Sequence, residues 1–181
     1  TVGRDPSEIR LMAVTKTVEP KMLMTTLIEE DVIDSAAFIT KWKGHFTNSN
    51  STYFDEKAYC EENNIDIDFN LRNGKKDIHT GAMEEITSAD CADFVLIIYE
   101  NTDSAGHNLG FTFNNPAYKD EFRTEDAYGY EVIKAIEARE TYETEDWLII
   151  VTSDHGGIGT GHGGPSIQER MNFVVMNKEW N

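Results

Sequence analysis

The chain has 181 residues, about one domain's worth, and 39% of them are hydrophobic before glycine is counted, which is typical of a folded globular protein. Its 33 acidic residues outnumber 16 basic ones, and the formal net charge of −17 argues against nucleic-acid partners and anionic membrane surfaces. No stretch approaches the roughly 20 apolar residues of a membrane-spanning helix, so we expect no membrane insertion by this segment.

The first half of the chain alternates between helical and extended patterns. Pro20 can begin a helix over residues 20–30, where apolar side chains recur at helical spacing. A short apolar run at residues 35–40 predicts a strand, and helices are predicted at residues 55–63 and 78–88.

The second half predicts strands that are buried on both faces. Residues 93–100, 147–153 and 172–176 are apolar without alternation, and an amphipathic helix at residues 125–139 separates the first two. A strand, a helix and a strand at this spacing form a crossover unit. We therefore predict an α/β fold with a mostly parallel central sheet and helices on both faces. Ligands bind such sheets beyond the carboxyl ends of the strands.

Two of these predicted strand ends carry an aspartate and a histidine each, namely Asp103 and His107, and Asp154 and His155. The first pair is four residues apart, so one turn of helix would place both side chains on one face. The second pair is adjacent and needs a sharp turn to converge, for which Gly156 and Gly157 supply backbone freedom. Carboxylate and imidazole ligands without thiolate suit zinc or manganese. One such pair is usually just a capped turn, but two pairs at strand ends predict a metal site.

The motifs around these residues, DSAGHNLG at 103–110 and TSDHGG at 152–157, resemble those of the alkaline phosphatase superfamily. Within it they resemble the type I phosphodiesterase/nucleotide pyrophosphatase group. The segments 21–42 and 134–139 are also similar, so the likeness covers most of the chain. The resemblance implies an alkaline-phosphatase-like core that holds two divalent ions, usually zinc, around a nucleophilic Thr or Ser. By motif, Asp103 and His107 would bind one ion, and Asp154 and His155 the other.

A further histidine completes the first ion's ligand set in this family, and His162 is the available candidate. The superfamily's cofactor-independent mutases place that histidine soon after the second motif, whereas many phosphodiesterases place it much later. His162 could therefore be a metal ligand, contact substrate or shape its glycine loop, and a mutase reaction stays open on this spacing alone. His45 and His79 lack a ligand partner nearby in sequence and are interpreted as structural.

The resemblance implies a metal-dependent hydrolase of small phosphoric esters, of the phosphodiesterase/nucleotide pyrophosphatase type. The family's nucleophile and one more Asp ligand come from an N-terminal segment, and nothing before Lys21 matches it, so no catalytic nucleophile is assigned. We expect residues 1–181 to form one α/β metal-binding domain without that segment and without C-terminal strands, completed by further chain segments. The alternative is a non-catalytic structural or binding module that retains the fold and some metal ligands.

The sequence gives little information about the substrate or the cellular compartment. Phe111, Phe113 and Tyr118 could stack on a nucleotide base or cover the core beside the site. An N-glycosylation sequon begins at Asn50, and Cys60 and Cys91 could pair or remain separate thiols. Together the sequon and the thiols favour an extracellular or secretory location.

Overall fold

The structure is a computed structural model and describes residues 9–12, 33–47, 51 and 53–179. These residues form a 6-stranded sheet in the order β3–β2–β4–β1–β5–β6. The strands are β1 (Ile9–Met12), β2 (Ser35–Thr40), β3 (Asp66–Leu71), β4 (Phe94–Ile97), β5 (Asp146–Thr152) and β6 (Val174–Met176). All pairs among β1 to β5 are parallel, whereas β6 pairs antiparallel with β5. The mostly parallel sheet is therefore confirmed.

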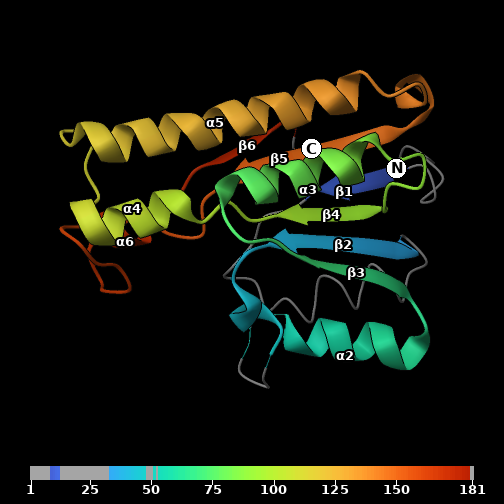
Figure 1. Ribbon diagram of the computed structural model, residues 1–181, viewed down its shortest axis with the longest axis horizontal. Helices are drawn as coiled ribbons and strands as arrows, with labels where there is room; N and C mark the ends of the chain where they lie inside the picture. Colours follow the sequence, from blue (N-terminus) through green and yellow to red (C-terminus); the bar gives the residue numbers. More distant parts are fainter. Residues whose placement is uncertain (1–8, 13–32, 48–50, 52, 180–181) are drawn as a thin grey trace.

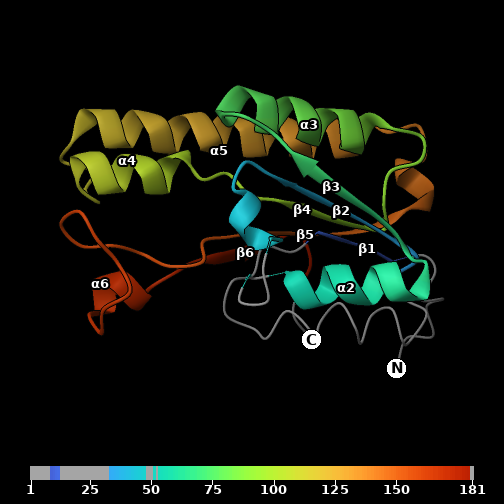
Figure 2. The same cartoon turned by 60° about the horizontal axis from the view of Figure 1, so that its bottom comes forward.

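Helices cover both faces of this sheet (Figures 1 and 2). One face carries α2 (Phe54–Asn63), and the opposite face carries α3 (Lys75–Thr87) and the long α5 (Pro116–Glu137). The shorter α4 (Asn101–Leu109) follows β4 and packs against α5. Three one-turn elements complete the described chain: η2 (Lys43–His45), η3 (Tyr142–Thr144) and α6 (Ile167–Arg170).

Strands β2 and β4 are buried on both faces, as their unbroken apolar sequences predict. In β2, Ala37 and Ile39 belong to the core beneath α3 and α5, while Phe38 belongs to the core on the other face. Residues of β4 alternate in the same way. Ile78 and Ile136 are fully buried and anchor α3 and α5 to the sheet.

Most predicted elements are found, with shifted ends. The largest shift is in α5, which begins nine residues before the predicted start. The Asn115 side chain accepts a hydrogen bond of 3.0 Å from the Ala117 N–H, and Pro116 occupies the first turn. This is a regular helix start, because proline is tolerated where no backbone donor is needed. The predicted helix over residues 20–30 lies outside the described residues.

β1, β3 and α6 were not predicted, nor were the one-turn helices η2 and η3. The sequence of β3, DIDFNL, alternates polar and apolar residues, the pattern of a half-buried edge strand. The short α6 begins with a capping box between Ser166 and Glu169. β1 is four residues long, too short to stand out, yet it occupies a central position between β4 and β5.

Cys60 and Cys91 are both buried and are not joined by a disulfide, so the pairing that the sequence left open does not form. Asn50 lies outside the described residues, and its glycosylation stays a prediction. Within the part of the chain that the structure describes, no helix is long and apolar enough to cross a membrane.

A buried ion pair joins the end of α5 to the start of β5. Arg139 donates from Nε and Nη2 to the two carboxylate oxygens of Glu145, at 2.8 and 2.9 Å. Arg139 also donates to the Ser88 carbonyl at 3.0 Å, which ties in the end of α3. The hydrogen bonds from Arg139 are the largest cause of a lowered pKa of Glu145, from 4.5 to about 2. Burial acts in the opposite direction, and hydrogen bonds from Trp147 and Thr141 lower the pKa further.

The variant Glu145→Gln should remove part of the pH dependence of stability. Because folding lowers the pKa of this carboxyl, the carboxylate stabilises the folded state above pH 4.5, and this stabilisation is lost as the pH falls toward about 2. Urea unfolding of the variant should show lower stability at neutral pH and a smaller further loss over that range. Glu143→Gln, at an exposed neighbouring position, is the control. An unchanged acid slope in Glu145→Gln would contradict this assignment.

Candidate metal centre

The predicted site residues lie at the carboxyl edge of the parallel sheet. Asp103 and His107 lie on α4, which begins four residues after the end of β4, so the predicted helical turn is confirmed. Asp154 and His155 follow β5, and an antiparallel bridge between Ile158 and Gly161 folds the next residues into a hairpin-like turn. Only β1 separates β4 from β5 in the sheet.

Asp103 is at the centre of the cluster. Its Oδ1 lies 3.5 Å from His162 Nε2 and 4.0 Å from His155 Nε2. Its Oδ2 lies 3.5 Å from His107 Nε2, and the Nε2 atoms of His107 and His162 are 3.1 Å apart. Asp103, His155 and His162 each offer one potential ligand atom, and these three atoms all lie within 4.8 Å of one another. His162 thus reaches the other predicted ligands across the sheet edge.

Asp154 is close to the same cluster through His155. Its Oδ2 lies 3.4 Å from His155 Nε2, and its Oδ1 accepts the His155 backbone N–H at 3.0 Å. His155 therefore lies between the two aspartates, with its ring stacked on that of His162 at a centroid distance of 3.7 Å. All five residues that the sequence singled out come together at this edge.

Two of the imidazoles are oriented by backbone carbonyl groups. His107 Nδ1 lies 2.9 Å from the Thr160 carbonyl oxygen, and His155 Nδ1 lies 2.9 Å from that of Gly156. A carbonyl oxygen only accepts, so each Nδ1 carries the proton. In the neutral form, the Nε2 lone pair of each ring then faces the cluster, which is the arrangement of metal-binding histidines.

The chemistry of these residues fits a divalent cation. Asp103 Oδ1 is buried and makes no hydrogen bond with any described residue, although such an oxygen is costly to leave unsatisfied. Ligand atoms at about 2.0–2.1 Å from a tetrahedral zinc ion lie about 3.3 Å from one another. In the group of Asp103, His155 and His162, the Asp103 Oδ1 atom lies 3.5 Å from His162 Nε2 and 4.0 Å from His155 Nε2, not far from that value.

The glycines after His155 serve a different purpose from the one predicted. Neither Gly156 nor Gly157 has a positive φ, so backbone freedom does not explain them. A Cβ on Gly156 would lie 2.1 Å from the Gln168 carbonyl oxygen, and one on Gly157 would lie 2.3 Å from the Phe111 ring. They allow close packing around the histidines.

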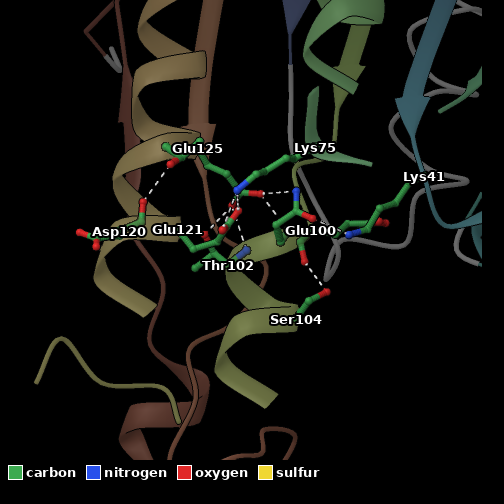
Figure 3. A network of polar contacts seen from close by, with 10 residues as sticks. Lys41, Lys75, Glu100, Thr102, Ser104, Asp120, Glu121 and Glu125 are labelled. Carbon is green, nitrogen blue, oxygen red and sulfur yellow. Dashed lines mark hydrogen bonds and ion pairs between the residues drawn. The ribbon is translucent and has the colours of Figure 1, made fainter. Parts of the chain in front are cut away.

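A glutamate from α5 caps the helix that carries Asp103 (Figure 3). Glu125 accepts the backbone N–H groups of Asn101 and Thr102 at 2.8 and 3.1 Å, and also the Thr102 hydroxyl. The residue before α4, Glu100, provides no such side-chain cap. Glu125 therefore satisfies the first donors of α4, and sequence reasoning missed it because it lies 24 residues away from Asn101.

The remaining two histidines lie outside the cluster, in agreement with their structural interpretation. His45 is buried, with Nε2 3.4 Å from Glu100 Oε1. His79 stacks on Tyr128 between α3 and α5, and its ring nitrogens face Tyr99 and Glu131.

Residues 10–169 match the sequence profile of the family described as Type I phosphodiesterase / nucleotide pyrophosphatase. The chain belongs to this family. The match includes residues 10–20, which the sequence motifs alone do not assign to the family.

Among solved structures, the chain is similar to murine ectonucleotide pyrophosphatase/phosphodiesterase 5, determined as an inactive variant in complex with AMP. The identity is 20%, the TM-score is 0.44, and the alignment covers 71% of this chain and 30% of that one. The chain thus spans less than a third of that protein. No curated protein sequence is significantly similar to it.

Removing the cap in Glu125→Ala should destabilise the fold. Two helix-terminal N–H groups lose their acceptor, and loss of such a cap lowers the free energy of unfolding by about 1–2 kcal/mol. Asp126→Ala is the matched control, because Asp126 is exposed on the same helix. Urea unfolding of both variants measures the difference, and equal stabilities would show that Glu125 does not stabilise α4.

Proposed function

We propose that this chain is the metal-binding part of a hydrolase of small phosphoric esters, of the phosphodiesterase/nucleotide pyrophosphatase type. The observation that carries the proposal is the buried Asp103 Oδ1, which has no hydrogen bond among the described residues and faces His155 and His162. Membership of the family supports the class of substrate.

Two divalent ions, zinc or manganese, are the proposed cofactors. Asp103, His107 and His162 would hold one ion, with Asp103 facing His107 through Oδ2 and His162 through Oδ1, each at 3.5 Å. Asp154 and His155 would hold the other. When bound, such a pair of ions stabilises the attacking and leaving oxygens of displacement at phosphorus.

The chain's own residues prepare this site in two ways. The carbonyls of Thr160 and Gly156 fix the tautomers of His107 and His155, so that both Nε2 atoms are ready to bind. The side chains of Asp103 and His107 are 42% and 45% exposed, so a solvent-borne ester can approach from their side.

The nucleophile is proposed to be a Thr or Ser upstream of Asp103, as in the family, and no residue is assigned. The position of β1 supports an upstream origin, because β1 lies between β4 and β5, parallel to both, and ends at the same edge as the metal centre. Further chain segments are proposed to complete the domain. The extracellular or secretory location stays a prediction from the sequence.

Asp103→Asn should remove most of the metal and the activity. The amide keeps the shape of the carboxylate but loses its charge. Mutation of a residue that only hydrogen-bonds to a metal ligand typically lowers metal affinity by about 10- to 100-fold. Because Asp103 would contact the ion directly, its substitution should lower the affinity by more than that. Elemental analysis and hydrolysis of bis(4-nitrophenyl) phosphate and 4-nitrophenyl phosphate, with and without chelator, measure both effects in the full-length protein, which includes the segments proposed to complete the domain. Asp120→Asn, exposed on α5, is the control.

The outcomes separate the two readings of the chain. Bound metal with chelator-sensitive cleavage of the diester supports the hydrolase. Bound metal without cleavage of either ester contradicts it and favours the non-catalytic module. Full metal content and full hydrolysis in Asp103→Asn would show that the site lies elsewhere.

A further inference from the structure

One aromatic ring fills the space between the two halves of the proposed metal centre. Phe111 follows α4, and its backbone N–H donates to the Gly159 carbonyl at 2.8 Å, in the loop that follows β5. Its ring meets the imidazole of His107 at a centroid distance of 5.5 Å and that of His162 at 6.1 Å. Both contacts are edge-to-face, with interplanar angles of 81° and 89°.

The ring fits because a glycine lies on each side of it. A Cβ on Gly106 would lie 2.3 Å from Phe111 Cε1, and a Cβ on Gly157 would lie 2.3 Å from Phe111 Cγ. Neither glycine has a positive φ, so the missing side chain is required for space and not for backbone conformation. Gly106 precedes His107, and Gly157 follows His155 by two residues. The two sequence motifs therefore each contain a glycine that makes room for this ring.

The neighbouring Phe113 is different, although it belongs to the same loop. It is 56% exposed, and its ring contacts among the described residues are with Tyr118 and Phe122, away from the histidines. Phe111 therefore packs against the site, whereas Phe113 lies on the surface.

We infer that Phe111 is a positioning residue that holds His107 and His162 at the separation needed to bind one ion. The inference rests on the proposed function, because it requires the metal centre. A packed aromatic ring is incompressible and fixes edge-to-face neighbours in orientation. With Phe111 in place, α4 cannot shift relative to the loop after β5 without displacing the ring, so the ligands from both segments keep their relative positions.

The test compares the full chain with its Phe111→Leu and Phe113→Leu variants. Zinc affinity is measured by competition with a chromophoric chelator, and the visible absorption of the cobalt-loaded proteins reports ligand geometry. Phe111→Leu should weaken zinc binding by about 10- to 100-fold, as loss of an outer partner does, and change the cobalt spectrum. Phe113→Leu should leave both unchanged. Thermal unfolding of the metal-free proteins checks that each variant is folded.

Equal zinc affinities and equal cobalt spectra in both variants would overturn the role of Phe111 while leaving the metal centre intact. Failure of the unsubstituted chain to bind zinc would instead overturn the proposed function. A second measurement does not depend on a variant that folds. In the unsubstituted protein, zinc addition should shift the aromatic NMR signals of Phe111 and leave those of Phe113 in place, and unmoved Phe111 signals would overturn the inference.

Discussion

The spacing of strands in a parallel sheet controls what can meet at its edge. Neighbouring strands lie about 4.8 Å apart, so two strands with one between them are separated by roughly 10 Å. In this chain β4 and β5 have that relation, with β1 between them. Because the strands are parallel, the side chains that follow both strands extend over the same edge. Asp103 from one side and His155 and His162 from the other span the gap over β1.

The orientation of α4 is fixed from several directions, and this matters because α4 carries Asp103. Glu125 binds its first backbone donors, and Thr40 at the end of β2 donates to Glu100 at 3.0 Å. Phe111 separates its far end from the loop after β5. These contacts come from the sheet, from α5 and from a loop, so the position of Asp103 depends on the whole fold.

Charge explains why a cation suits this edge. Asp103 and Asp154 place two carboxylates beside His155 in a chain whose net charge is already −17. Asp103 and Glu100 each have a buried oxygen with no hydrogen bond among the described residues. A phosphate ester would be repelled by such a surface, so binding requires local positive potential at the site. The histidines supply neutral ligands for the ions that would provide it.

The sequence predicted features that are local in the chain. The apolar runs of β4 and β5 predicted these two strands, and the four-residue spacing of Asp103 and His107 indicated that one helical turn would place both on one face. Tertiary features could not be predicted. The contact of Glu125 with Asn101 spans 24 residues and has no periodicity to reveal it. The packing of Phe111 between two motif glycines likewise depends on how α4 meets the loop after β5.

The strand β3 and the start of α5 could have been predicted, because both have a recognisable local sequence pattern. The alternation in β3 is regular, and the asparagine and proline at 115–116 are a standard helix start. For β1, four residues are too few for a pattern to be distinguished from chance.

The most direct test of the central claim is a crystal structure of the protein grown with zinc, with anomalous difference maps collected on both sides of the zinc absorption edge. The account predicts a peak at about 2.0–2.2 Å from Asp103 Oδ1 and from the Nε2 atom of His162. Zinc bound only elsewhere, with no peak beside Asp103, would contradict it.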